Sequence, residues 1–257
     1  MSKKEDILSD GVTKVVRVGE TVHRTPGLWT PSVHALLKYI REREFLAAPQ
    51  ALGFDAEGRE ILSFIEGTVC NYPLPPDARS KKALISAAKL LRLYHDATVD
   101  FVSRYQGSWQ LDMHPPLEVI CHGDYAPYNC VMKNDEVIGI IDFDTAHPGS
   151  RVWDVAYAVY RFAPLTSPEN KDGFGSRKEQ AERLKIFCME YGLLDLDKLI
   201  PTVMERLMAL INFMDTRAKA GDKAYQQHLD HGHHKLYLND YNYIKNNVEF
   251  FSAVITL

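Results

Sequence analysis

The stretch ICHGDYAPYN at residues 120–129, followed by IIDFD at residues 140–144, decides how this chain is interpreted. In the first stretch four residues separate Asp124 from Asn129, and in the second an apolar run leads to Asp142. One carboxylate can receive a hydroxyl proton, while an amide oxygen and a second carboxylate are hard ligands of the kind that Mg²⁺ prefers. Phosphoryl transfer needs such a set, because its loose transition state depends on positioning and on neutralising phosphate charge.

The same Asp and Asn spacing in isolation is usually turn chemistry, because these side chains readily bond their own backbone. Here, however, the surrounding residues predict short strands at 117–121, 130–132 and 137–143, which are joined by polar loops. These elements form one linked arrangement: a strand, a polar loop with an acid and an amide, and a further strand that ends in an acid. This arrangement favours a functional site over an ordinary turn.

The N-terminal part of the chain predicts a small antiparallel sheet with one helix. β-Branched runs at 15–18 and 21–22 predict a first hairpin, and apolar runs at 51–54 and 60–65 predict a second. Between the hairpins, a proline after a threonine and then helical apolar spacing predict a helix from about Pro31 to Glu44.

The rest of the chain predicts a larger, mainly helical unit. Three prolines within residues 71–79 predict a linker, and a long helix is predicted at 80–98. Helical patterns dominate after about Ser176. We therefore predict an α+β fold with a small lobe at residues 1–66 and a large lobe at residues 67–257.

Composition excludes several classes of protein. The chain has 257 residues, of which 46% are hydrophobic and 25% charged, with a formal net charge of -4. Nucleic acid is therefore a poor partner, because such binding needs a basic excess. The start of the chain is rich in acids and no 18 apolar residues run together, so we expect neither an export signal nor a membrane span. Four cysteines without a CxxC spacing indicate reduced thiols in the cytoplasm.

The motifs resemble those of a known group. HGD at 122–124 with Asn129, followed by IDF at 141–143, is similar to the aminoglycoside phosphotransferase and choline kinase family, bacterial relatives of the protein kinases. In that family HGDxxxxN takes the place of HRDxxxxN, and an IDF or IDW strand end takes the place of DFG. The resemblance extends from about Leu8 to Phe162 and implies a two-lobed, protein-kinase-like fold.

The resemblance implies roles for the large-lobe residues. Asp124 would orient or deprotonate the hydroxyl of the acceptor, and Asn129 and Asp142 would bind Mg²⁺. His122 would brace the catalytic loop, and Asp154 would support the site structurally.

In the small lobe the resemblance implies a nucleotide site for ATP or GTP. Arg24 would hold the phosphates, since the family has Lys or Arg at the end of the third strand. The turn at Gly11 would approach the phosphates closely. The backbone at Ser63, Phe64 and Ile65 would bind the adenine edge.

The small lobe also departs from the family pattern. The glutamate expected on the helix is absent, and His34 stands in its place. Either another acid such as Glu44 or Glu60 holds Arg24, or the alignment has shifted. An acid, Asp10, replaces one of two turn glycines, which predicts modest nucleotide affinity.

Two features near the C-terminus have plainer interpretations. The histidines at 228–234 have no cysteine nearby, which favours a solvated helix end over a zinc site. Tyr237, Tyr241 and Tyr243 are interpreted as core packing, with a wall of a substrate pocket as the alternative.

Two functions remain open at this stage. The first is an ATP- and Mg²⁺-dependent small-molecule O-phosphotransferase, whose acceptor in this family is commonly cationic: an aminoglycoside, choline or an amino sugar. The alternative is a nucleotide-binding regulator or pseudo-enzyme, which the missing helix glutamate favours. The three intact residues Asp124, Asn129 and Asp142 favour the enzyme. We predict a hydroxyl acceptor and a nucleoside triphosphate as partners, and the sequence predicts neither the identity of the acceptor nor the oligomeric state.

Overall fold

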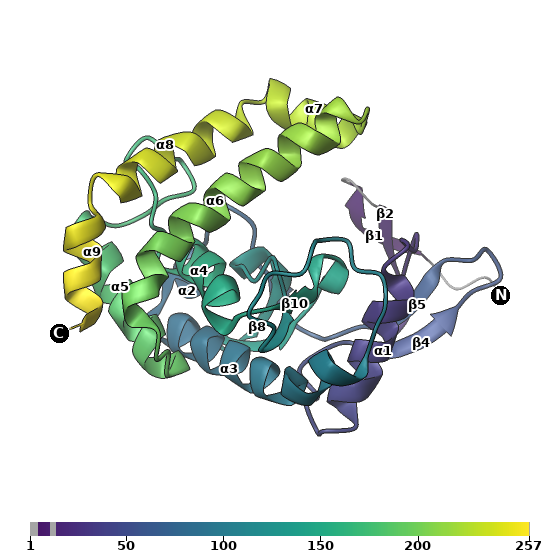
Figure 1. Ribbon diagram of the computed structural model, residues 1–257. Coiled ribbons are helices and arrows are strands. Elements are labelled where there is room, and N and C mark those ends of the chain that lie inside the picture. The colour runs from purple at the N-terminus through teal and green to yellow at the C-terminus, as the bar shows by residue number, and fades with distance from the viewer. Residues whose placement is uncertain (1–4, 11–13, 257) are drawn as a thin grey trace.

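The structure is a computed structural model of the chain that describes residues 5–10 and 14–256. The chain forms a small lobe built on a sheet, at the right of Figure 1, and a larger, mainly helical lobe at the left. This architecture confirms the predicted α+β class. The lobe boundary after residue 66 stays a prediction.

The small lobe is a five-stranded antiparallel sheet with strand order β1-β2-β3-β5-β4. Its strands are β1 (Asp6–Asp10), β2 (Lys14–Val18), β3 (Thr21–Arg24), β4 (Ala51–Phe54) and β5 (Glu60–Ser63). Both predicted hairpins form, and Gly19 takes a φ of 66° in the first turn. The register of β3 and β5 places Arg24 opposite Glu60. A cation and a carboxylate are therefore fixed on neighbouring strands.

The helix of the small lobe, α1 (Thr30–Arg41), begins with a proline in its first turn, as predicted. It buries Val33, Leu36 and Ile40 along one face. The helix ends at Arg41 rather than near Glu44, because the chain turns there and Glu44 adopts a φ of 62°. Since α1 packs against α3 (Lys81–Arg104), the long helix of the large lobe, it links the two lobes.

The strands of the large lobe include β6 (Thr68–Val69), which pairs with β8. The other strands of this lobe are β7 (Val119–Cys121), β8 (Cys130–Lys133), β9 (Glu136–Ile140) and β10 (His147–Gly149). Its helices are α2 (Pro76–Arg79), α3 (Lys81–Arg104), α4 (Arg151–Phe162), α5 (Arg177–Tyr191), α6 (Leu196–Lys219), α7 (Lys223–Asp230), α8 (His233–Lys245) and α9 (Val248–Thr256). The long helix predicted at 80–98 thus extends to Arg104.

The core of the large lobe is centred on α3. This helix buries Leu84, Leu91 and Tyr94 and packs against β7, β9 and α5. Each fully buried leucine contributes about 1.5–3 kcal/mol of hydrophobic free energy. The loops that follow β7 and β9 are therefore mounted on a well-packed support.

The C-terminal helices form an arm beside this core. Figure 1 shows α6 crossing the large lobe diagonally, with α7 and α8 folded back from its far end. α6 packs against α4, α7 and α8. The chain turns at Gly221 and Gly232, both with positive φ, which divides the predicted helical region into separate helices.

Among the helices of the described ranges, none combines the length and the apolar character needed to cross a membrane. The four cysteines are all buried, and none forms a disulfide.

Candidate active site

The loop after β7 has a backbone that only glycine fits at one position. Gly123 has a φ of 80°, and a Cβ at this residue would collide with the carbonyl oxygen of Thr145. His122 is fully buried, and its Nε2 donates to the carbonyl oxygen of Ile141 over 2.9 Å. The imidazole therefore ties the loop after β7 to the loop after β9.

Asp154, in the first turn of α4, anchors the same loop from the other side. Its carboxylate accepts hydrogen bonds from the backbone amides of His122 (2.7 Å) and Gly123 (2.9 Å) and contacts Nε2 of His95 at 2.9 Å. Burial alone would raise the pKa of Asp154, but these donors outweigh burial and lower the pKa to about 2. Asp154 is therefore a fixed anion that holds the loop backbone.

Asp124 presents a carboxylate that is held at both oxygens. Tyr128 donates its hydroxyl to Oδ1 over 2.6 Å, and Asn129 donates its side-chain amide to Oδ2 over 2.9 Å. The hydroxyl of Tyr157 lies 2.9 Å from that of Tyr128, so it can donate to the Tyr128 oxygen. Burial raises the pKa of Asp124, and the bond from Tyr128 opposes that rise. The sequence analysis missed Tyr128, although its position four residues after Asp124 was a usable signal.

The two expected metal ligands lie on loops that are hydrogen-bonded to one another. The backbone amide of Ile141 donates to the carbonyl oxygen of Asn129 over 2.9 Å, which joins the two loops. Asn129 uses its side-chain nitrogen for Asp124, so its side-chain oxygen is available. Asp142 lies beyond the end of β9 with a φ of 62°, and its side chain is 49% exposed. One amide oxygen and one carboxylate suit Mg²⁺ whose remaining positions are filled by water and phosphate oxygens.

Arg24 reaches this pair from the small lobe. The side chain is 8% exposed and donates to three carboxylates: from Nε to Glu60, from Nη1 to Asp142 over 3.0 Å, and from Nη2 to Asp144. Burial lowers the pKa of Arg24, but the surrounding carboxylates outweigh it and raise the pKa above its usual value. The guanidinium therefore stays charged.

The question of what holds Arg24 has a clear answer in the structure. Of the two acids considered, Glu60 bonds Arg24, and its other oxygen contacts Nε2 of His34 at 2.9 Å. His34 stands at the helix position at which the family resemblance predicts a glutamate. The carboxylate partner of Arg24 therefore comes from β5, where the strand register places Glu60 opposite Arg24.

The expected nucleotide-binding backbone is partly engaged. The amides of Ser63 and Phe64 donate to the carbonyl oxygens of Gln50 and Glu20, each over 2.9 Å. Ile65 makes no backbone hydrogen bond to any other residue that the structure describes, so its polar groups can receive a base. Gly11 lies outside the described residues.

A cleft of about 740 Å³ opens beside Asp124. Its walls come from α4, α6, α7, α8 and the segment at 111–114. Its aromatic lining consists of Tyr128, Trp153, Tyr157, Phe213, Tyr225 and Tyr237. Of the three C-terminal tyrosines, Tyr237 lines this cleft, which was the alternative interpretation. This volume is typical of a pocket for a drug-sized molecule.

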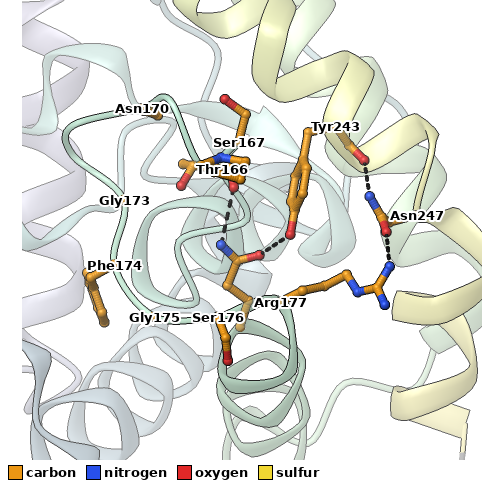
Figure 2. Close-up of a pocket in the computed structure, with 12 residues that line it drawn as sticks. Thr166, Ser167, Asn170, Gly173, Phe174, Gly175, Ser176, Arg177, Tyr243 and Asn247 are labelled. Atoms are coloured by element: carbon orange, nitrogen blue, oxygen red, sulfur yellow. Dashed lines mark hydrogen bonds between the residues drawn. The ribbon is translucent and has the colours of Figure 1, made fainter.

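A second cavity, of about 540 Å³, lies between the segment at 166–176, α5 and α8 (Figure 2). Its polar groups bond one another: Tyr243 donates to Gln180, Gln180 donates to the carbonyl oxygen of Thr166, and Arg177 donates to Asn247. The cavity is therefore a braced junction between helices rather than a reactive site.

Within residues 5–10 and 14–256, no three His, Cys, Asp or Glu side chains gather in a group that could hold a metal ion.

Comparisons with known proteins place these features in context. The model of the Phosphotransferase enzyme family matches residues 106–185, which include both loops. A trifolitoxin immunity protein from Rhizobium leguminosarum bv. trifolii is 32% identical over 191 residues, which are 71% of this chain and 72% of that protein.

Solved structures show the same architecture at low sequence identity. A protein from Ralstonia eutropha JMP134, assigned as an aminoglycoside phosphotransferase, superposes with a TM-score of 0.65 at 16% identity, over 95% of this chain and 93% of that chain. A choline/ethanolamine kinase family protein from Mesorhizobium loti gives 0.60 at 13% identity, over 99% and 93%. These matches confirm the two-lobed, kinase-like fold.

Proposed function

Because this chain belongs to the phosphotransferase enzyme family, we propose that it transfers the γ-phosphate of ATP or GTP to a hydroxyl group of a small molecule. The observation that carries the proposal is the position of Asp124. Its carboxylate lines the 740 Å³ cleft and is bonded to Asn129, which adjoins the loop of Asp142. A hydroxyl compound in the cleft and a nucleotide held from the small lobe would meet at this carboxylate.

Asp124 would accept a hydrogen bond from the acceptor hydroxyl and take up its proton as the phosphoryl group transfers. Tyr128 and Asn129 each donate to one carboxylate oxygen, so the orientation of the carboxylate is set before the acceptor arrives. Asn129 and Asp142 would hold Mg²⁺, which when bound neutralises charge on the phosphate oxygens.

Arg24 would bind the phosphates from the opposite side. Its bond to Glu60 holds Nε, while the terminal nitrogens face Asp142 and Asp144. A phosphate that replaced these two carboxylates would receive the same forked, charge-assisted hydrogen bonds. Ile65 would receive the base, and the proposed role of Gly11 near the phosphates is unchanged.

The test is an ADP-release assay with Mg·ATP and Mg·GTP across aminoglycosides, choline, macrolides and simple sugars. With an acceptor that works, Asp124→Asn should lower kcat by about 10²–10⁴-fold while nucleotide affinity changes little, because the carboxylate acts on the hydroxyl. Asp100→Asn is the matched control, since Asp100 is an exposed carboxylate on α3 that does not line the cleft. Equal turnover by the Asp124→Asn enzyme would overturn the assignment.

The name of the 32% identical relative supports a proposal about what this reaction does for the cell. That relative is an immunity protein. Phosphorylation of a toxic hydroxyl compound is one chemical route to immunity, so this chain would protect a cell in which it is expressed. Expression of the wild type, but not of the Asp124→Asn variant, should raise the concentration of toxin that a sensitive strain survives. Equal protection by both would favour sequestration without turnover.

The competing regulator hypothesis loses its main argument. It rested on the absent helix glutamate, and Glu60 supplies the missing carboxylate to Arg24. Binding of Mg·ATP without turnover of any acceptor would restore it. A cationic acceptor stays a hypothesis, for which the cleft offers the exposed carboxylates of Asp112 and Glu205. The four free, buried cysteines support a cytoplasmic location, which we also propose.

A further inference from the structure

A histidine on the wall of the cleft presents an unused ring nitrogen beside the loop of Asp124. His147 begins β10, and the pairing of β10 with β7 places it opposite Cys121, the last residue of β7. Its ring carbon Cε1 lies 3.2 Å from the point where a Cβ on Gly123 would stand, and Gly123 directly precedes Asp124 in the chain. The strand register therefore holds the imidazole against the loop that carries the proposed catalytic carboxylate.

The surroundings of His147 fix which ring nitrogen carries the proton. Nδ1 lies 2.8 Å from the carbonyl oxygen of Thr145, and because a carbonyl oxygen can only accept, Nδ1 is the donor. Thr145 is itself tied to the loop, since its hydroxyl donates to the carbonyl oxygen of His122 over 3.0 Å. Burial, aided by the charge of Arg206, outweighs the bond to Thr145 and lowers the pKa of His147 to about 4. The ring is therefore neutral at pH 7, and Nε2 carries a lone pair.

Nε2 of His147 is the part of the ring that remains for a ligand. The residue is 1% exposed, yet it lines the cleft of about 740 Å³. Nε2 makes no hydrogen bond within residues 5–10 and 14–256, and it is not sealed from solvent. The nearby Arg206 donates its Nη2 to the carbonyl oxygen of Gly123 instead. A largely buried acceptor without a protein partner gains free energy when a donor of a ligand reaches it.

Two other side chains of this wall do not offer the same group. His114 stacks on Trp153 with 3.6 Å between the ring centroids, and its Nδ1 is sealed from solvent without a partner. Its Nε2 lies 3.6 Å from the carboxylate of Glu205. Arg206 also lines the cleft, but a guanidinium can only donate. Of these three side chains, only His147 has a backbone partner that fixes one ring nitrogen as an acceptor.

We propose that Nε2 of His147 accepts a hydrogen bond from a second hydroxyl or N–H group of the substrate, close to the hydroxyl that reacts at Asp124, and that His147 thereby selects diols and amino alcohols. The inference rests on the proposed function and adds a specificity-determining residue to it. A substrate with one isolated hydroxyl, or with a quaternary ammonium group and no N–H, would leave Nε2 unpaired and would bind less tightly.

The first test determines the position of the proton by NMR and needs no turnover. The ¹⁵N chemical shifts of an imidazole distinguish a protonated nitrogen from an unprotonated one. The spectrum of His147→Asn, or of His147→Gln where the first variant does not fold, identifies the signals of His147 among the ten histidines. At pH 7 we expect a protonated Nδ1 and an unprotonated Nε2. A protonated Nε2 would overturn the proposal, because that nitrogen would then donate rather than accept.

The second test adds two matched probes to the same sample, 3-phenoxypropane-1,2-diol and 3-phenoxypropan-1-ol. Both carry an aromatic ring for the apolar lining of the cleft and a primary hydroxyl, and only the diol has a second donor beside that hydroxyl. The diol should shift the Nε2 signal of His147, and the mono-alcohol should shift it less. Equal responses to the two probes, including no response to either, would contradict the proposal.

Variants separate the accepting nitrogen from the bond to Thr145. Asparagine can keep the donor to Thr145 but does not extend to the position of Nε2, whereas glutamine can bring its carbonyl oxygen there. In the ADP-release assay the wild type should favour the diol over the mono-alcohol by about two- to tenfold in kcat/KM, the range for one hydrogen bond between neutral groups. His147→Asn should abolish this preference, and His147→Gln should retain part of it.

The matched control is His231→Asn, because His231 is an exposed histidine that does not line the cleft. Each ratio compares two substrates on one enzyme, so a general loss of activity in a variant cancels. A preference that persists in His147→Asn would remove His147 from the proposal. If no compound supports turnover, the proposed function fails, while the NMR titration still decides whether His147 binds the second donor.

Discussion

Replacing Tyr128 by phenylalanine should shift the pH dependence of the reaction. The hydroxyl of Tyr128 donates to Oδ1 of Asp124 over 2.6 Å, and the substitution removes this donor without opening a large cavity. Burial raises the pKa of Tyr128 well above its usual value, so the hydroxyl remains protonated and able to donate. In the proposed mechanism Asp124 must be ionised to receive the acceptor proton, so activity should fall as the pH drops through its pKa.

The size of the shift in the pKa of Asp124 follows from the negative charge on Oδ1, which accepts the hydrogen bond from Tyr128. A hydrogen bond to an ionised group contributes about 1.5–3 kcal/mol, which is a factor of about 10–150 in the protonation equilibrium. Since Tyr128 stabilises the ionised form, its loss should move the acid limb of kcat/KM to higher pH. At a pH well above this limb the effect on kcat should be much smaller, unless the carboxylate also loses its orientation.

The assay is kcat/KM from ADP release between about pH 5 and 9, for the wild type and Tyr128→Phe. Tyr125→Phe is the matched control, because Tyr125 lies in the same loop but donates to the carbonyl oxygen of Ala87 in the core. Tyr157→Phe removes a hydroxyl that contacts Tyr128 rather than the carboxylate itself, so it should shift the acid limb by less. An acid limb that Tyr128→Phe leaves unmoved would refute this account of how Asp124 is ionised.

Three further predictions concern the residues around the site. The folded-state pKa of Asp154 is about 2, below the usual 3.8, so the ionised carboxylate stabilises the fold above about pH 4 and loses this effect as the pH falls toward 2. Asp154→Asn should therefore lower the free energy of unfolding by about 2 kcal/mol or more at pH 7 and by little near pH 2, as measured by denaturant unfolding. Asp142→Ala should weaken Mg²⁺-dependent nucleotide binding in calorimetry, and normal Mg·ATP affinity would contradict its role as a ligand. Glu60→Gln should raise the KM for nucleotide with a smaller effect on kcat, because it loosens Arg24; an unchanged KM would separate Arg24 from nucleotide binding.

The parts of the site that the sequence predicted are those defined by short-range patterns. Asp124 and Asn129 lie in one loop, and Asp142 follows an apolar strand, so their types and spacing were sufficient to predict that they lie near one another, while their roles stay a prediction. Tyr128 was overlooked although it lies four residues after Asp124, because the spacing alone does not show that its hydroxyl, rather than that of Tyr125, donates to the carboxylate. Arg206 lies on a helix where an arginine usually faces water, and only the approach of α6 to Gly123 buries it. Tyr237 reaches the cleft because the chain turns at Gly221 and Gly232, which a periodic pattern does not reveal.

The choice between Glu44 and Glu60 illustrates the same limit. Glu44 follows the predicted helix, where a glutamate would be sought, but the turn after α1 gives it a φ of 62° and leaves it exposed. Glu60 became the partner through a strand register, and register is set by pairing across the whole sheet rather than by local sequence.

The position of Glu60 on β5 has a consequence for regulation. In protein kinases the partner glutamate lies on a helix, and the position of that helix controls whether the ion pair forms. Here Arg24 and Glu60 lie on hydrogen-bonded neighbouring strands, so their contact is fixed whenever the sheet is folded. His34 still links α1 to Glu60, but a shift of α1 would break only the bond to the imidazole. The ion pair that orients Arg24 is therefore built into the sheet, which suits the proposed role of Arg24 in holding phosphate whenever the small lobe is folded.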